Sequence, residues 1–171
     1  ELVRNLYLGA EAEISLCTLF GYEVVVKRRR SKGYRRGELD RRIVATRTAH
    51  EALMLSRARG LGVPTPIVLH VNPVEGLIVM QYIKGPTVRE LTAKAPLGEL
   101  KPLFQQIGRS LALLHGSGIV HGDPTTSNMI LRGKEVYMVD FGLASHAAEV
   151  EQMGEDLYVL HMALRSAHHA R

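Results

Sequence analysis

Two short polar segments carry the residue types that phosphoryl transfer requires. The first is His121-Gly122-Asp123 with Asn128, and the second is Asp140, which directly follows an apolar run. The Asp123 carboxylate can orient a hydroxyl or a water for attack, while oxygens of Asn128 and Asp140 can hold Mg²⁺ against phosphates. The competing interpretation is a polar turn over 122–127 and a chance Asp-Phe-Gly. Because both segments occur together and in this order, we favour phosphoryl transfer.

A lysine and a glutamate upstream complete the set that protein kinases use. Lys27 closes the run Val24-Val25-Val26, which has the form of the kinase strand whose lysine neutralises phosphate oxygens. Glu51 lies in the middle of a predicted helix and is the predicted partner that fixes this lysine. The alternatives are a surface lysine and a solvated glutamate. Asp40 is a second candidate anchor, but its place at the start of the helix favours a cap.

The segments expected to contact nucleotide are less regular. The glycine-rich pattern of a phosphate-covering loop is absent, and only Gly9-Ala10-Glu11-Ala12 separates the first two predicted strands. One glycine allows a tight turn rather than a flexible flap, so contact between this loop and ATP is left open. Further along, Gln81, Tyr82 and Ile83 are predicted to present backbone groups to the adenine edge.

The periodicity of apolar residues predicts the elements that must position these groups. Strands are expected over 1–7, 13–20, 22–27, 67–71 and 77–81, and a helix over 40–59. Thr87 and Glu90 have capping-box spacing and predict a short helix, followed by a helix over 100–116 and strands over 129–131 and 136–139. The face expected to pack in the first helix comprises Leu39, Ile43, Thr46, His50, Leu53 and Met54.

The order of these elements predicts an α+β class and a minimal two-lobed protein-kinase-like fold in one domain, 1–171. A small β-rich N-lobe with one helix covers 1–81, a hinge covers 82–86, and a reduced helical C-lobe covers 87–171. Asp156 is placed where the last helix opens. It is expected either to cap that helix or to bond to the backbone of the loop beginning at His121; both residues are assigned structural support.

Charge and composition limit the classes of partner. The net charge is +5, and Lys27–Arg42 holds nine Lys or Arg against two acidic residues. Such a block is typical of a surface that binds phosphate or nucleic acid, although a solvated face is the alternative. Cys17 is the single cysteine, which fits a reduced, cytoplasmic setting. No stretch approaches the roughly 20 apolar residues that span a bilayer, so no membrane is expected.

Several motifs together give a specific resemblance. Gly62-Val63-Pro64-Thr65-Pro66, the Thr125–Ile130 segment and Asp156-Leu157-Tyr158 accompany the residues above. The chain resembles the small atypical kinase subunit of the KEOPS complex, the PRPK family, in its short archaeal form. The resemblance covers nearly the whole chain, and Thr125–Ile130 is its most discriminating part.

The resemblance implies more than the spacing does. It implies a reduced kinase fold, ATP hydrolysis with Mg²⁺, and serine autophosphorylation. It also implies a metal-bearing threonylcarbamoyl-transferase subunit as partner of the C-lobe, a small accessory subunit on the N-lobe, and tRNA in the assembled complex. The basic segment then becomes a candidate tRNA-facing surface, comprising Arg28, Arg29, Arg30, Lys32, Arg35 and Arg36.

Departures and alternatives remain. Pro124 stands where the family usually has leucine and favours an extended Asp123. The sequence stops at Ala170-Arg171, soon after the last predicted helix, where family members usually continue into a basic tail. A RIO-like protein kinase and a small-molecule phosphotransferase share His-Gly-Asp. A non-catalytic scaffold with a kinase fold is the third class. The presence of Lys27, Asp123, Asn128 and Asp140 argues against a scaffold, since it has no chemical need for all four.

Overall fold

The computed structural model of this protein describes residues 2–9, 12–30, 37–146 and 149–168. The chain forms two compact units. The first comprises Glu1–Leu53 with Pro66–Tyr82, and the second comprises Met54–Thr65 with Ile83–Arg171. The segment 54–65 therefore belongs with the second unit, whereas the sequence boundary at 81 placed it in the N-lobe.

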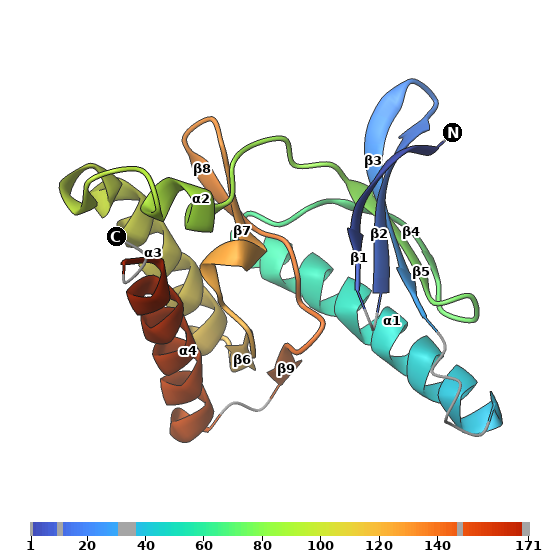
Figure 1. Cartoon of the computed structure of the whole chain (residues 1–171). Helices are drawn as coiled ribbons and strands as arrows, with labels where there is room; N and C mark the ends of the chain where they lie inside the picture. Colours follow the sequence, from blue (N-terminus) through green and yellow to red (C-terminus); the bar gives the residue numbers. More distant parts are fainter. Residues whose placement is uncertain (1, 10–11, 31–36, 147–148, 169–171) are drawn as a thin grey trace. The chain divides into compact units, whose positions relative to one another are not determined.

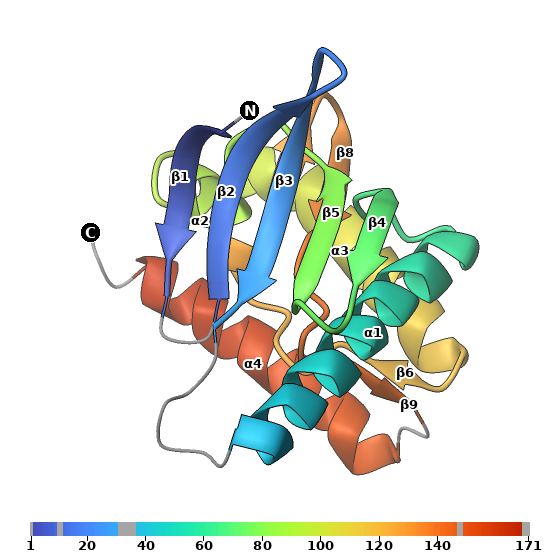
Figure 2. The same cartoon turned by 90° about the vertical axis from the view of Figure 1, so that its right-hand side faces the viewer.

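The first unit is built on a five-stranded antiparallel sheet (Figure 2). Its strands are β1 (Leu2–Leu8), β2 (Ala12–Leu19), β3 (Tyr22–Arg29), β4 (Val68–Asn72) and β5 (Leu77–Gln81), in the order β1-β2-β3-β5-β4. Phe20 and Gly21 turn β2 into β3 with positive φ angles of 48° and 82°. The central position of β3 gives Lys27 a strand neighbour on each side, Ile14 and Ile78.

Helix α1 (Gly37–Gly60) starts earlier than predicted and buries a different face. Leu39 and Leu53 are exposed, and of the expected packing residues Met54 is fully buried. The predicted face was wrong because the buried side carries polar groups with internal partners, which hydrophobicity does not reveal. Thr48, for example, donates to Val44 O at 2.7 Å. The buried residues of α1 are Asp40, Thr48, Glu51, Ala52, Met54, Leu55 and Ala58.

The second unit is mainly helical and contains a small hairpin (Figure 1). Its helices are α2 (Val88–Thr92), α3 (Lys101–Gly116) and α4 (Val150–His168), with 3₁₀ turns η1 (Leu97–Leu100) and η2 (Thr126–Asn128). Strands β7 (Met129–Arg132) and β8 (Glu135–Met138) form the hairpin, and β6 (Ile119–Val120) pairs with β9 (Ser145–His146). The pair β6–β9 was not predicted, because two residues are too few to show a period.

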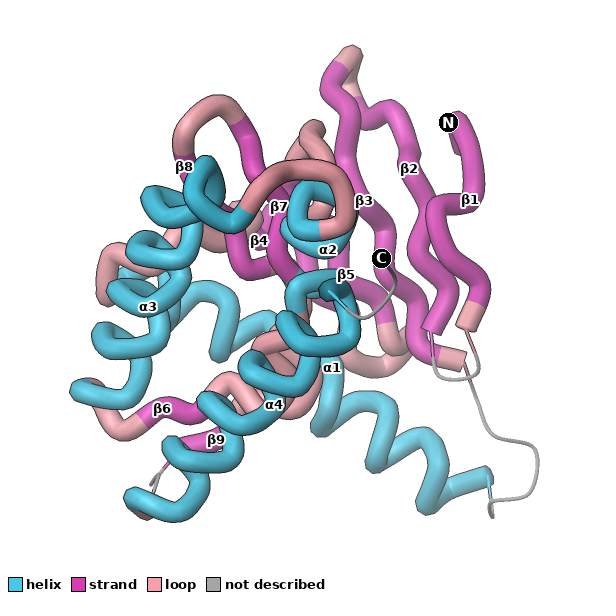
Figure 3. Tube along the Cα trace, turned by 60° about the vertical axis from the view of Figure 1, so that its left-hand side comes forward, coloured by secondary structure: helices cyan, strands magenta, loops and turns pink. Residues whose placement is uncertain are grey.

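Helix α3 supports strand β6 and the β7–β8 hairpin of the second unit and can be followed in Figure 3. Leu103, Ile107, Leu111 and Leu114 recur at helical spacing and are all buried. On the same helix, the Gln106 side-chain amide donates to Lys134 O at 2.8 Å and accepts from Val136 N at 3.2 Å. These two bonds fix the β7–β8 hairpin on α3.

The entry to α2 confirms the predicted capping box. The Thr87 hydroxyl accepts from Glu90 N at 3.2 Å, and the Glu90 carboxylate accepts from Thr87 N at 2.7 Å. These bonds, first to the Thr87 backbone and then to its hydroxyl, lower the pKa of Glu90. The box therefore satisfies two backbone donors at the start of a helix too short to be stable alone.

The linker into the second unit is fixed to strand β7. Leu131 N donates to Pro86 O at 3.0 Å, and Thr87 bridges to Ile130. A Cβ at Gly85 would lie 1.9 Å from Leu131 O, so this position tolerates only glycine. Residues 85–87 are therefore an anchored segment of the second unit rather than a free hinge.

We predict that Gly85→Ala destabilises the protein by about 2 kcal/mol, because the added methyl group meets backbone that cannot rotate away. The matched control is Gly108→Ala on α3, where nothing lies within 4 Å of an added Cβ. There the substitution should stabilise the helix by up to about 1 kcal/mol. Thermal unfolding of both variants tests this, and an unchanged midpoint for Gly85→Ala contradicts the close approach.

Candidate active site

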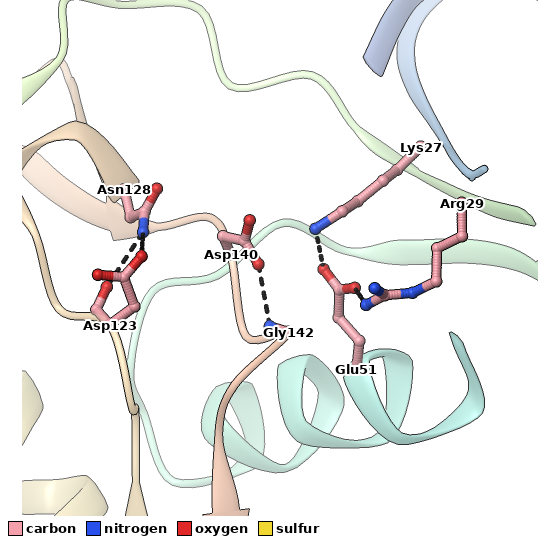
Figure 4. Close-up of polar contacts among 7 residues, drawn as sticks. All are labelled: Lys27, Arg29, Glu51, Asp123, Asn128, Asp140 and Gly142. Atoms are coloured by element: carbon pink, nitrogen blue, oxygen red, sulfur yellow. Dashed lines mark hydrogen bonds and ion pairs between the residues drawn. The ribbon is translucent and has the colours of Figure 1, made fainter. Parts of the chain in front are cut away.

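In the first unit, strand β3 and helix α1 bring three charged side chains together (Figure 4). Lys27 Nζ donates to Glu51 Oε1 at 2.6 Å. Arg29, two residues along the same strand face, donates from Nη2 to Glu51 Oε2. Glu51 is fully buried, and both cations are nearly so. The structure thus contains the Lys27–Glu51 pair expected from the sequence and adds a second cation.

The predicted tRNA-facing set separates into three groups. Arg28 and Arg30 are exposed, as such a surface requires. Arg29 is not available to it, because its side chain is 9% exposed and paired with Glu51. The alternation of a strand accounts for this difference, since every second residue points to the opposite face. Lys32, Arg35 and Arg36 lie outside the described residues.

The cap interpretation of Asp40 is wrong. Helix α1 begins at Gly37, so Asp40 lies inside its first turn, where it is 2% exposed. Because Lys27 Nζ lies 2.6 Å from Glu51 Oε1, the structure favours Glu51 over Asp40 as the anchor of this lysine.

In the second unit, Asp156 holds the loop that begins at His121. Its carboxylate accepts from His121 N and from Gly122 N, both at 2.8 Å. Asp156 is buried in the second turn of α4, six residues after the helix begins. Of the two expected roles, the structure therefore confirms the bond to the loop, whereas the placement at the helix start was wrong.

The loop also requires glycine at position 122. Gly122 has a φ of 80°, and a Cβ there would lie 2.4 Å from Leu143 O. Side chains are disfavoured by both the backbone angle and the space. The His-Gly-Asp form of the motif is thus a packing requirement of this loop.

His115 is a member of this network that sequence reasoning missed. Its Nε2 lies 2.9 Å from Asp156 Oδ2, the oxygen that also accepts from His121 N. The histidine is on α3, 41 residues away in sequence, and carries no motif. A leucine-rich helical face ending in a histidine was the available signal, and it does not distinguish a network member from a surface residue.

His121 itself is completely buried. Its Nδ1 accepts from Asp123 N at 3.3 Å, and its ring lies 4.6 Å from that of Phe141. Nε2 has no hydrogen-bond partner in the part of the chain that the structure describes. Burial lowers the pKa of His121, against opposing effects of Asp156, Asp140 and Asp123. We infer that the neutral form supports the loop between Asp156 and Asp123.

Asp123 and Asn128 form the polar end of the same loop (Figure 4). The Asn128 amide nitrogen donates to Asp123 Oδ2 at 2.8 Å and to Asp123 O at 3.0 Å. Pro124 is buried between them, and Thr125 N donates back to Asp123 O at 2.8 Å. The structure thus accommodates Pro124 with Asp123 held by its neighbours.

The donor set suits Mg²⁺ bound together with phosphates. Asp140 Oδ1 accepts from Gly142 N at 2.9 Å, which orients the carboxylate. Because the Asn128 nitrogen is engaged by Asp123, the amide oxygen is the atom left for a cation. Within the described ranges no three His, Cys, Asp or Glu side chains cluster as a metal site. One carboxylate and one amide are what a Mg²⁺ ion that keeps phosphate and water ligands needs.

The residues predicted to contact nucleotide differ in what the structure describes and in which of their backbone groups are available. Gly9 N donates to Ala12 O at 3.0 Å, while Ala10 and Glu11 lie outside the described residues. Gln81 N donates to Ile67 O at 2.8 Å, so its N–H is used by the sheet and is not available to adenine. Tyr82 and Ile83 remain candidates for that contact.

No helix among the described residues is long and apolar enough to cross a membrane.

Comparison with known proteins gives consistent matches. The RIO domain family matches residues 21–161. The KEOPS complex subunit Bud32 of Pyrococcus abyssi is 44% identical over 94% of this chain and 76% of its own length. A probable serine/threonine-protein kinase BUD32 homolog of Archaeoglobus fulgidus is 43% identical over 95% of this chain and 77% of its own length.

Two further comparisons extend to longer proteins. A probable bifunctional tRNA threonylcarbamoyladenosine biosynthesis protein of Methanothermobacter thermautotrophicus is 41% identical over 95% of this chain, which spans only 29% of that relative. The crystal structure of the Rio2 kinase-ADP/Mg²⁺-phosphoaspartate complex from Chaetomium thermophilum superposes with a TM-score of 0.76. It is 14% identical and covers 92% of this chain and 54% of its own, so it shows the fold.

The buried neutral His121 predicts a pH dependence of stability. Free histidine titrates near pH 6.5, and the pKa of His121 is lowered in the folded protein. Below about pH 6.5 the unfolded chain therefore binds a proton that the folded chain does not, and the free energy of unfolding should fall by up to about 1.4 kcal/mol per pH unit. Urea unfolding between pH 7.5 and 5.5 measures this slope.

The variant His121→Gln should show a smaller slope than the parent protein, since the titrating group is gone. His70→Gln, at an exposed position on β4, serves as the control for the substitution itself. Equal slopes for the parent protein and His121→Gln would contradict a buried neutral imidazole.

Proposed function

The chain belongs to the RIO-domain kinase family and to its Bud32 branch, and we propose on this premise that it is a Mg²⁺- and ATP-dependent phosphotransferase or ATPase of tRNA threonylcarbamoyladenosine biosynthesis. The observation that supports it most is the fixed Asp123–Asn128 pair on a loop held by the buried Asp156. Bound Mg²⁺-ATP supplies the transferable phosphoryl group and neutralises charge on it.

Asp123 is proposed to orient the attacking hydroxyl or water. Its carboxylate is partly exposed, its backbone is fixed at both ends, and one of its oxygens accepts from Asn128 at 2.8 Å. A carboxylate held in this way accepts a proton from a nucleophile without having to reorganise. Asn128 and Asp140 are proposed to hold Mg²⁺ through their side-chain oxygens.

Lys27 is proposed to bind phosphate oxygens, with Glu51 fixing its position. The burial of this pair supports a function over a scaffold role. Buried ion pairs are often no more stabilising than apolar residues of the same volume, because desolvation offsets their attraction. A scaffold gains little stability by keeping Lys27 and Glu51 charged and buried, whereas an ATP-binding site needs the lysine.

The partners are proposed from the relatives. Relatives named as KEOPS subunits support assembly with a metal-bearing transferase subunit and a small accessory subunit. Relatives named for tRNA threonylcarbamoyladenosine biosynthesis support tRNA as the nucleic acid. In the first unit, four exposed arginines of the basic segment are candidate phosphate contacts, and we call this set the basic face. It comprises Arg28, Arg30, Arg41 and Arg42.

The catalytic assignment predicts different effects for two neighbouring substitutions. Asp123→Asn keeps the side-chain size and loses the charge that polarises a nucleophile. ATP turnover should drop by roughly 10² or more, while Mg²⁺-ATP affinity stays within about threefold. Asp140→Ala removes a metal ligand, so Mg²⁺-dependent affinity should itself be lost.

Steady-state turnover and calorimetric titration separate the two cases, and turnover should be measured with and without the transferase partner and tRNA. Tyr137→Phe, on the β7–β8 hairpin, is the control for a surface substitution in the second unit. Turnover of Asp123→Asn at the parent rate would reject the catalytic role and favour the scaffold.

The basic face predicts salt-dependent tRNA binding. Arginine–phosphate contacts release counterions, so affinity should fall steeply with salt, and loss of each contact should reduce the slope of log affinity against log salt by about one. The variant Arg28→Glu/Arg30→Glu should therefore bind tRNA more weakly in the assembled complex and with a shallower slope. Arg109→Glu/Arg132→Glu, exposed in the second unit, is the charge-matched control. Equal slopes in both variants would identify the face as merely solvated.

A further inference from the structure

The Glu51 carboxylate has one cation on each of its oxygens. Lys27 Nζ lies 2.6 Å from Oε1, and Arg29 Nη2 donates to Oε2 (Figure 4). The two cations therefore do not compete for the same acceptor atom. The kinase pattern requires a lysine on this carboxylate, and Arg29 is not part of that pattern.

The second cation changes what it costs Lys27 to leave Glu51. Glu51 is 0% exposed, and a buried carboxylate without a partner costs several kcal/mol. With Lys27 alone as its partner, Glu51 would hold the ammonium and oppose its transfer to a phosphate oxygen. With Arg29 in place, Glu51 keeps a charged partner when the ammonium moves away.

The backbone of Arg29 is held by the turn between β4 and β5. Arg29 N donates to Gly76 O at 2.9 Å. Gly76 has a φ of 66°, and a Cβ there would lie 2.6 Å from Val44 Cγ1 and 3.3 Å from Arg29 Cβ. The guanidinium is always charged at physiological pH and cannot lose its proton on burial as a lysine can. Arg29 is therefore a counter-ion of Glu51 that stays charged and extends from a backbone position held by its neighbours.

We propose that Arg29 is a positioning residue that compensates the charge of Glu51, so that Lys27 can divide its ammonium between Glu51 and a nucleotide phosphate. This inference rests on the proposed function, in which Lys27 contacts phosphate. It assigns Arg29 to the nucleotide site of the first unit rather than to the tRNA-facing surface.

The test compares ADP with adenosine, which lacks phosphates, as ligands of the full chain with Mg²⁺. In Arg29→Met, Lys27 becomes the sole partner of Glu51 among the residues that the structure describes, so ADP affinity should fall about tenfold or more, the size of one hydrogen bond to a charged group. Adenosine affinity should not change. Arg4→Met, exposed on β1 of the same sheet, is the control. Unchanged ADP affinity, or equal losses for both ligands, overturns the proposal.

A second comparison removes the buried charge of Glu51. It stays informative if Arg29→Met alone does not fold. In the Glu51→Gln background the side chain at 51 is neutral and needs no counter-ion. Adding Arg29→Met there should not lower the ratio of ADP to adenosine affinity any further, and a further fall overturns the proposal. Lys27→Met separates the two levels of the argument. An unchanged ratio in Lys27→Met rejects the proposed phosphate contact, whereas a fall there without one in Arg29→Met rejects the role of Arg29 alone.

Discussion

The buried carboxylate of Asp156 is the group on which the arrangement of the second unit depends. It receives two backbone N–H groups from the loop and the ring of His115, at distances of 2.8 to 2.9 Å. A buried charge is tolerated only where its partners are complete, so the loop, α3 and α4 are bound to one another through this side chain. The bond from His121 N to Asp156 lies two residues before Asp123 and helps to fix the direction of Asp123. The contacts of the Asp123 carboxylate are therefore not the only groups that orient it.

Glu51 has a comparable place in the first unit, with a different consequence. Asp156 binds two backbone N–H groups and the ring of His115, whereas Glu51 binds two cationic side chains, of which Lys27 is the one proposed to contact phosphate as well. The Asp156 carboxylate therefore fixes the geometry of the loop, and the Glu51 carboxylate controls the position of the Lys27 charge. Both are nearly inaccessible to solvent, where electrostatic interactions are strongest and an unpaired group is most costly.

The sequence predicted what is local or periodic and missed what depends on long-range contact. The five strands, the capping box of Thr87 and the Lys27–Glu51 pair follow from alternation, spacing and motif. Arg29 and His115 could not be placed, because their partners lie 22 and 41 residues away and neither residue belongs to a motif. The buried face of α1 was missed for a related reason. Hydrophobicity marks a face only when its buried residues are apolar, and here Thr48 and Glu51 are satisfied internally.

The close packing of Gly122 against Leu143 limits how this protein can be regulated. Many kinases are switched on when a phosphorylated segment is bound by arginine side chains near the catalytic loop. Position 122, next to Asp123, has neither the backbone angle nor the room for an arginine. A phosphate signal therefore has no receptor at this point of the loop. The helices that carry Asp156 and His115 hold the same loop, so a change in their position would reach Asp123 through hydrogen bonds rather than through a phosphate receptor.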